Sequence, residues 1–175
     1  MKQRPYTRRR SPKKAYEGYS KRELEKVLDS VFSVFIRLRV ANGDGYVKCF
    51  TCGAIMLWTK AQCGHYWSRI NRSLRWDEEN CQVQCMRCNI YMHGNYPKFG
   101  IELVRKYGVG ILERLDIKSS NVSRMKNFEL EVLILNYAAL IESMDKGDVL
   151  PRMYKNWRNH GTKKSRKQKK IGEEN

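Results

Sequence analysis

The sequence predicts an α+β fold in which a small strand-and-turn core, stapled by a four-cysteine zinc site, is flanked by helices and basic tails. Three observations support this prediction. The pairs Cys49-x-x-Cys52 and Cys85-x-x-Cys88 enclose a segment of short strand-like runs. Apolar residues at helical spacing precede and follow that segment. Runs of Lys and Arg lie near both ends of the 175 residues.

The chain divides into three parts. Residues 1–16 form a basic, flexible arm, because the stretch from Met1 to Lys14 holds seven cations and no acid. Residues 17–145 form the folded domain, and residues 146–175 form a basic tail. Within the domain we expect a first helix (20–41), a core (46–100) and C-terminal helices (101–145).

The first helix has a clear start signal. Ser20 and Glu23 match a capping box, in which the serine is the N-cap and the acid stands three residues later. Apolar residues then recur at helical spacing: Leu24, Val27, Leu28, Val31, Phe32, Phe35 and Leu38. The helix is expected to stop at the turn-rich run from Asn42 to Gly45.

Short strands and turns are predicted next, followed by further helices. The expected strands are Tyr46–Phe50, Ala54–Trp58 and Gln62–Trp67, and a loop rich in Arg and Asn spans Ser68–Arg75. A short helix is expected from Cys88 toward His93, and then helices over Ile101–Tyr107, Val109–Leu115 and Phe128–Met144. No apolar run approaches the ~20 residues that span a bilayer.

The net charge of +17, from 35 Lys and Arg against 18 Asp and Glu, favours a polyanionic partner. Neither an amphipathic basic helix nor a lipidation signal suggests a membrane. The basic run Lys163–Lys170 resembles the N-terminal arm, so nucleic acid is the expected contact of both tails. No secretory signal is present, so we expect a reducing, cytoplasmic location, in the host cell if the chain is phage-encoded.

Two CxxC turns give one zinc ion four thiolates, so Cys49, Cys52, Cys85 and Cys88 are the predicted ligands of structural Zn²⁺. The remaining cysteines, Cys63 and Cys81, are expected to be small buried residues. In an alternative assignment, Cys63 or Cys81 replaces one of these four zinc ligands.

Side chains suited to phosphodiester hydrolysis lie between and just after the cysteine pairs. The reaction needs an activated water and donors that hold the phosphate. His65 suits the first task because the ordinary pKa of histidine lies near neutral pH. Asn80 and Asn89 accompany it. A buried structural histidine is the alternative reading.

Taken together, the motifs of this region resemble the lambda NinG (Rap) family of phage recombination nucleases, and more widely the HNH, or ββα-metal, nucleases. They are also similar to the zinc-bearing T4-type junction-resolving endonuclease. The resemblance covers roughly residues 49–115. It rests on Cys49-x-x-Cys52, Gly64-His65-Tyr66, Leu74-Arg75, Asn80, Gln84-Cys85-x-x-Cys88-Asn89 and Gly94-Asn95.

The resemblance implies a ββα-metal core and a role for each matching residue. His65 would be the general base, and Asn80 would fix the loop that orients it. Asn89 would donate its side-chain oxygen to a catalytic Mg²⁺ or Mn²⁺. The implied activity is divalent-metal-dependent cleavage of branched DNA such as Holliday junctions or D-loops.

One position departs from the pattern. Many HNH enzymes place an acidic or histidine ligand just before the base, where this chain has Gly64. His93 is a candidate replacement ligand, since a helix would bring it and Asn89, four residues apart, to one face. Glu78 and Glu79 are alternatives.

Arg69, Arg72 and Arg75 are predicted to clamp phosphate, because the guanidinium fork pairs with phosphate in a bidentate way. A salt bridge from Arg75 to Asp77 or Glu78 is the alternative for that residue.

Other functions remain open from the sequence alone. The chain could be a zinc-ribbon nucleic-acid-binding protein without catalysis, or an HNH endonuclease acting on linear duplex DNA. Cutting two opposed strands of a junction would suit a homodimer.

Overall fold

The structure, a computed structural model, describes residues 18–144 and 147–159. The predicted arm (1–16) and the basic run Lys163–Lys170 lie outside these residues. The elements are α1 (Lys21–Leu38), β1 (Tyr46–Lys48), β2 (Ile55–Leu57), β3 (Gln62–His65), β4 (Cys81–Gln84), η2 (Arg87–Tyr91), α2 (Tyr96–Tyr107), α3 (Ile111–Ser119) and α4 (Asn127–Ser143). None of the helices in these ranges is long and apolar enough to cross a bilayer.

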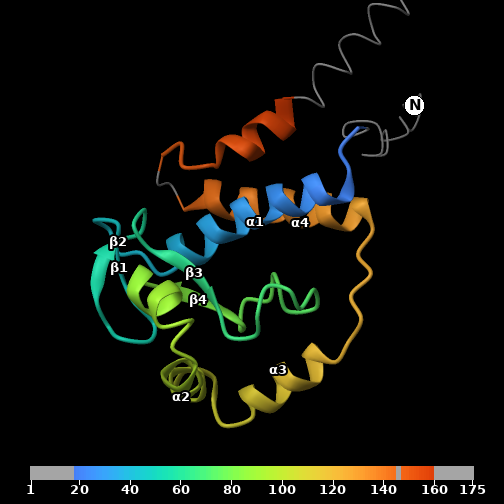
Figure 1. Cartoon of the computed structure of the whole chain (residues 1–175). Coiled ribbons are helices and arrows are strands. Elements are labelled where there is room, and N and C mark those ends of the chain that lie inside the picture. Colours follow the sequence, from blue (N-terminus) through green and yellow to red (C-terminus); the bar gives the residue numbers. More distant parts are fainter. Residues whose placement is uncertain (1–17, 145–146, 160–175) are drawn as a thin grey trace, which may run out of the picture.

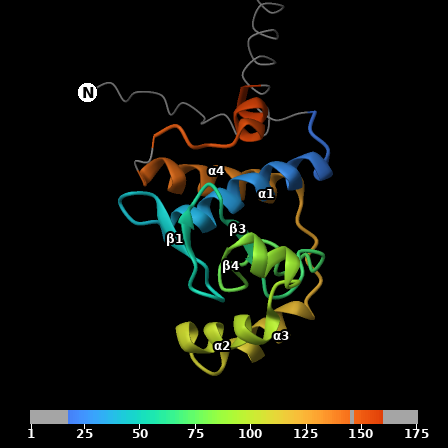
Figure 2. The same cartoon turned by 60° about the vertical axis from the view of Figure 1, so that its left-hand side comes forward.

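Helix α1 begins as predicted. The backbone N–H of Ser20 donates to the Glu23 carboxylate over 2.7 Å, and the N–H of Glu23 donates to Ser20 Oγ over 3.3 Å. Its apolar stripe is buried, and α1 lies alongside α4 in both views (Figures 1 and 2). This pair of helices forms one layer of the molecule and contains most of the larger hydrophobic core.

The folded part extends beyond the predicted boundary at residue 145. Residues 152–159 are helical and lie against the α1–α4 layer on the side away from the strands (Figures 1 and 2). Tyr154 and Trp157 from this helix are buried in the larger core. The sequence-based boundary is therefore too early, because these two aromatic side chains stand among cations that suggested a solvated tail.

Two small antiparallel sheets lie between the helical layers. Strand β1 pairs with β2, so that Tyr46 lies opposite Leu57, and β3 pairs with β4, so that His65 lies opposite Cys81. The three predicted strands are shorter than expected, and β4 was not predicted. Its sequence, Cys-Gln-Val-Gln, looks half-polar, yet all four of its residues are buried, whereas three of the four residues of β3 are partly exposed.

A second core supports the other side of the hairpin. Helices α2 and α3 pack together at the end of the molecule opposite α1 and α4 (Figure 2). Helix α2 starts at Tyr96, before the predicted Ile101, and Pro97 in its first turn is compatible with helix initiation. The second core consists of Leu74, Phe99, Leu103, Ile111 and Leu115.

Candidate metal centre and catalytic site

The four cysteines of the CxxC pairs converge. Their Sγ atoms all lie within 4.8 Å of one another, and those of Cys52 and Cys85 are 3.8 Å apart. Thiolates bound tetrahedrally at ~2.3 Å from zinc are separated by about 3.8 Å, so this spacing fits the ion. The cysteines come from the β1–β2 turn and from the end of β4 with η2. They can therefore hold a structural metal such as Zn²⁺.

The pKa values of two of these thiols reflect how closely the four sulfurs are packed. Burial alone raises the pKa of Cys49, but hydrogen bonds from the Thr51 hydroxyl and the Cys85 backbone N–H outweigh it and lower the pKa to about 6. Burial and the neighbouring sulfurs raise the pKa of Cys52 to about 12. Four thiolates at this spacing repel one another unless a positive ion lies between them.

Cys63 and Cys81 do not join this cluster. They form a separate group with His65 on the β3–β4 hairpin, so the alternative in which one of them replaces a ligand is wrong for this geometry. Cys81 is fully buried, as expected, whereas Cys63 is partly exposed.

His65 stands at the end of β3 and is held by a backbone contact. Its Nε2 lies 3.1 Å from the carbonyl oxygen of Arg75. A carbonyl only accepts hydrogen bonds, so Nε2 carries the proton and Nδ1 keeps a free lone pair. Burial lowers the pKa of His65 below 6.5, and the positive charge of Arg69 lowers it further, while the bond to Arg75 opposes this shift. The imidazole is therefore neutral near pH 7, with a lone pair on Nδ1 that can accept a proton.

Asn80 fixes the loop that supplies this carbonyl. Its side chain is fully buried. Oδ1 accepts from the Trp67 N–H over 2.7 Å, and Nδ2 donates to the carbonyls of Trp67 and Leu74 over 3.0 and 2.9 Å. The loop is thus tied at its start and one residue before Arg75. Asn80 lies where the sequence predicted a positioning residue.

Asn89 reaches the same strand from the other side. Its Nδ2 donates to Gln62 Oε1 over 2.6 Å. Gln62 precedes His65 by three residues, so the pleat of β3 directs these two side chains to opposite faces. Among the contacts of the described residues, none joins His65 to Asn89. Gln62 was not predicted as a site residue. Its two-residue spacing from Gly64 places both positions on the same face of β3.

Gly64 is required by its surroundings. A Cβ atom at this position would lie 2.1 Å from Gln84 Oε1. The buried Gln84 side chain is held in place because its Nε2 donates to the Gly94 carbonyl over 2.8 Å. Gln84 Oε1 itself is buried without a hydrogen-bond partner. The side-chain amide of Gln84 therefore fills the space that an acidic metal ligand would need at position 64. Gln84 was not predicted as a site residue.

His93 does not lie on a helix with Asn89, contrary to the prediction. The predicted short helix is a single π-helical turn that ends at Tyr91, and His93 follows it with a left-handed φ of 49°. The side chains of Asn89 and His93 therefore do not share a helical face.

The acidic alternatives are engaged elsewhere. Glu78 pairs with Arg39 over 2.8 Å, and Glu79 pairs with Lys118 over 2.9 Å. Within residues 18–144 and 147–159, the only groups of three or more His, Cys, Asp or Glu that could hold a metal are the two cysteine-containing clusters. Within these ranges, no group of three or more carboxylates is therefore available for the predicted catalytic Mg²⁺ or Mn²⁺.

The three loop arginines pair with acids on α1. Arg75 contacts Asp29 through two nitrogens, over 2.9 and 2.5 Å, rather than the Asp77 or Glu78 suggested by sequence. Arg69 also pairs with Asp29 over 2.8 Å. These contacts form because the loop folds back onto α1, which sequence proximity did not reveal.

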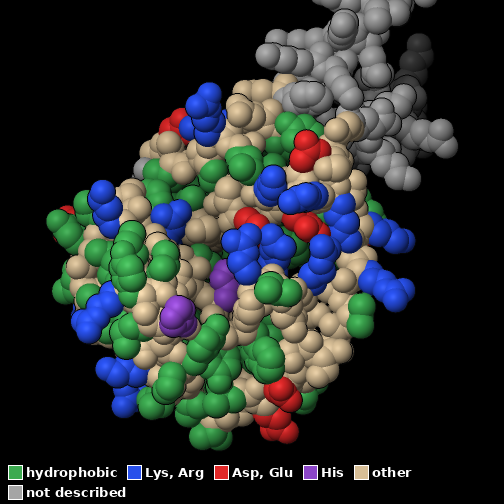
Figure 3. Space-filling model, in the orientation of Figure 1, with side chains coloured by type: hydrophobic (Ala, Val, Ile, Leu, Met, Phe, Trp, Pro, Cys, Tyr) green, Lys and Arg blue, Asp and Glu red, His purple; other side chains and the backbone are tan. Residues whose placement is uncertain are grey.

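The arginines differ in exposure. Arg72 pairs with Glu25 over 2.7 Å, and its side chain remains 52% exposed. The Arg69 side chain is 61% exposed and that of Arg75 only 16%. Figure 3 shows a group of Lys and Arg side chains gathered around acidic ones, with the two described histidines beside it on the same face. Arg69 and Arg72 are therefore the better candidates for contacting phosphate.

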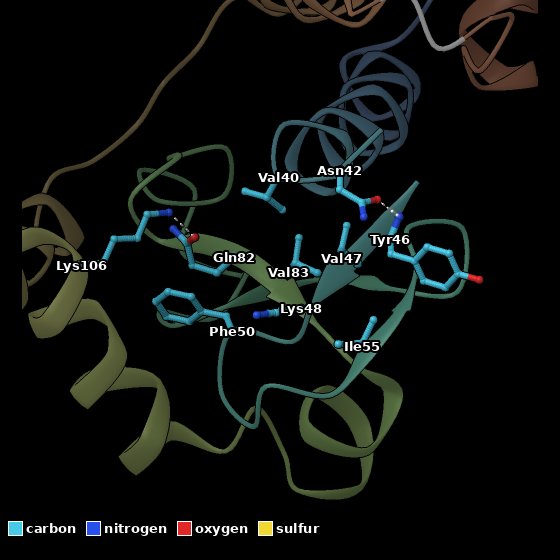
Figure 4. A pocket seen from close by; sticks show the side chains of 10 residues that line it. All are labelled: Val40, Asn42, Tyr46, Val47, Lys48, Phe50, Ile55, Gln82, Val83 and Lys106. Carbon is cyan, nitrogen blue, oxygen red and sulfur yellow. Dashed lines mark hydrogen bonds between the residues drawn. The ribbon is translucent and has the colours of Figure 1, made fainter. Parts of the chain in front are cut away.

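A cavity of about 320 Å³ lies away from this site, between the end of α1, the β1–β2 hairpin and α2. Figure 4 shows Lys106 donating to Gln82 beside the ring of Phe50 at one side of it. None of the sequence-predicted site residues lines this cavity. This cavity therefore carries no argument about the candidate catalytic groups.

Comparison with known proteins agrees with the motif pattern. Residues 2–148 match the family described as bacteriophage lambda NinG protein. Over 94 residues the chain is 31% identical to protein ninG of Escherichia phage 933W and 30% identical to those of Salmonella phage P22 and Escherichia phage lambda. Each match covers 52% of this chain and 43% of the relative, so the chain spans less than half the length of these relatives. No solved structure matches it. The chain belongs to the NinG family.

Proposed function

We propose that this protein is a metal-dependent DNA endonuclease of the HNH type. The observation that carries the proposal is the hydrogen bond from His65 Nε2 to the Arg75 carbonyl, which leaves Nδ1 of this partly exposed side chain as the base. The β3–β4 hairpin followed by η2 supplies two strands and a short helical segment, as expected of a ββα-metal core. The cysteine cluster would hold both parts in register around Zn²⁺.

Each residue would have a distinct task in hydrolysis. His65 Nδ1 would accept the proton of the attacking water, and the Arg75 carbonyl would stabilise the imidazolium that forms. Asn80 would keep the ring oriented through the loop that it ties. Arg69 and Arg72 would contact phosphates with the nitrogens that their acidic partners leave exposed.

The catalytic ion would be Mg²⁺ or Mn²⁺, which prefer oxygen ligands and would stabilise negative charge on the phosphate. Asn89 would supply its side-chain oxygen, and Nδ2 of the same amide donates to Gln62 on the face of β3 opposite His65. Because neither side chain is charged, the DNA phosphate would have to supply the negative ligand. His93 would be a further ligand, through an exposed side chain that lies after the end of η2.

The substrate would be DNA, with branched recombination intermediates as the preferred form. The net charge of +17 supports a polyanionic substrate. The preference for Holliday junctions or D-loops comes from the family resemblance alone. Symmetric nicking of a junction would suit a homodimer, and light scattering with and without a junction would measure it.

The test compares a four-way junction, a linear duplex and a single strand in Mg²⁺. Wild type is expected to cut the junction fastest, and His65→Ala is expected to bind it equally well without cutting. Glu113→Gln, an exposed change on α3, serves as a preparation control. Cleavage by His65→Ala at the wild-type rate would contradict the proposal, and a preference for one linear site would indicate a sequence-specific enzyme instead.

A non-catalytic zinc-containing DNA-binding protein is the second candidate. It is favoured by the lack of any contact between His65 and Asn89 among the described residues. A protein of this kind should bind a junction through the arginine loop (Ser68–Arg75). It should not cut the junction with Mg²⁺ or Mn²⁺ in any variant.

A further inference from the structure

We propose that Cys63, His65 and Cys81 form a second metal site, specific for a thiophilic ion such as Zn²⁺, and that an ion bound there removes His65 from catalysis. The ligand atoms of these three side chains lie within 4.8 Å of one another. The regulatory half of the proposal rests on the proposed endonuclease function, whereas the metal site itself does not.

The register of the hairpin creates this cluster. Cys63 and His65 are two residues apart on β3, so they project from the same face. Cys81 lies directly opposite His65 on β4. The three groups are therefore held together by backbone pairing, and no loop has to close for them to meet. Gly64, between the first two, points to the other face, where Gln84 fills the space.

The environment of the cluster is closed on one side and open on the other. Cys81 is fully buried, while Cys63 and His65 are partly exposed. An ion can therefore reach the site from the surface that carries His65 and displace thiol protons as it binds. Two thiolates and a neutral imidazole balance the charge of a divalent ion, which matters because Arg39 lies near Cys81.

The ligand set selects the kind of ion. Two sulfurs and one imidazole nitrogen suit Zn²⁺ and other soft or borderline ions, and disfavour Mg²⁺, which prefers oxygen. Three protein ligands leave one tetrahedral position for water. This set is distinct from the four-sulfur site, which is complete with its own cysteines.

An ion here stops His65 from acting as a base through either ring nitrogen. At Nδ1 it would occupy the lone pair that accepts the proton of water. At Nε2 it would replace the proton that bonds to the Arg75 carbonyl, and the ring would lose its orientation. Zn²⁺ is therefore expected both to stabilise the protein at the four-cysteine site and to inhibit it at the second site.

The first experiment counts ions without relying on activity. The full chain, kept reduced with a phosphine, is dialysed against buffered Zn²⁺ and analysed for bound metal. Wild type is expected to bind two ions, and Cys63→Ser to bind one at the same free concentration. The variant should weaken the second ion by more than about 100-fold, since losing even an outer partner of a ligand costs about 10- to 100-fold. Cobalt provides a spectroscopic check, because thiolate-to-cobalt absorption at the second equivalent should disappear in Cys63→Ser.

His93→Gln is the matched control, because it removes the other described histidine and leaves the cluster intact. It should bind two ions like wild type. One ion in wild type, or a second ion that survives Cys63→Ser and is lost in His93→Gln, would overturn the site. Since Cys63 is partly exposed, its serine variant is expected to stay folded, and circular dichroism would verify this. Should that variant unfold, His65→Gln gives the same count by removing the imidazole ligand.

A second experiment separates the site from its effect. If the protein cuts DNA, added Zn²⁺ should inhibit wild type in excess Mg²⁺ and spare Cys63→Ser. Equal inhibition of both would overturn the regulatory role. If no preparation cuts DNA, the endonuclease proposal fails while the ion count still decides the metal site.

Discussion

His65 Nε2 lies 3.1 Å from the carbonyl oxygen of Arg75, ten residues later in the chain. The same arginine reaches across to Asp29 on α1 with its side chain. One residue therefore connects the candidate base to the larger core by its backbone and its side chain together. Substitutions in the loop or in α1 are therefore expected to alter the position of the His65 imidazole through Arg75.

The first prediction concerns pH. Burial holds the pKa of His65 below its ordinary value of 6.5. A base must be neutral to accept a proton, so activity should be present above the lowered pKa and be lost as pH falls through it. The acid limb of kcat/KM for junction cleavage should have its midpoint below 6.5. A midpoint clearly above 6.5 would contradict the assignment of His65 as base.

The second prediction concerns Asn80. Replacing it with Ala removes three hydrogen bonds and leaves the Trp67 N–H and carbonyl without these partners, while the Leu74 carbonyl keeps its bond from the Asp77 N–H. The expected loss of unfolding free energy is about 2–4 kcal/mol, measured by urea denaturation.

Asn80→Asp is the matched comparison. It keeps the acceptor for Trp67 but places carboxylate oxygen against the Trp67 and Leu74 carbonyls, so it should be no more stable than the alanine variant. An aspartate variant as stable as wild type would show that the amide donor is unimportant.

The third prediction couples Gly64 to Gln84. Gly64→Ala should cost about 1–3 kcal/mol of stability because its methyl group overlaps the Gln84 amide. Gln84→Ala should also be destabilising, since it removes the bond to the Gly94 carbonyl. The double variant should lose less than the sum of the two single changes, because shortening Gln84 makes room for the methyl group. Strict additivity in denaturant unfolding would mean that the two side chains do not compete for space.

The fourth prediction concerns the structural ion. Cys85→Ser should abolish binding of the first zinc and unfold the β1–β2 hairpin and η2, because binding energy at such a site is largely folding energy. Hydrogen exchange resolved by peptide would locate the loss. Cys63→Ser, which changes the other cluster, should leave exchange in the β1–β2 hairpin unchanged. A fully folded, metal-free Cys85→Ser protein would argue against a zinc-dependent core.

Local signals in the sequence identified several elements correctly. The capping box located the start of α1, and the CxxC spacing located four cysteines that do converge. Helices α3 and α4 were also recognised, since their apolar residues recur at helical spacing. In each case the information lies within a few residues of the feature itself.

Features that depend on distant residues were missed. Strand β4 looks polar until Tyr107 and Gly94 are seen to accept from its glutamines. The partners of Arg69 and Arg75 come from Asp29, about 40 residues earlier in the chain. Cys63 and Cys81 lie close together because of the register of the β3–β4 hairpin. The spacing of cysteines along the sequence does not reveal that register.

The three arginines of the loop Ser68–Arg75 are already paired with carboxylates on α1. Glu25 and Asp29 hold its guanidinium groups in the free protein much as phosphates would hold them in a complex. On the proposed function, a nucleic acid would have to displace two carboxylates to reach these guanidinium groups. That exchange would weaken binding to any single stretch of backbone, and it would favour a substrate whose shape brings several phosphates to the loop at once.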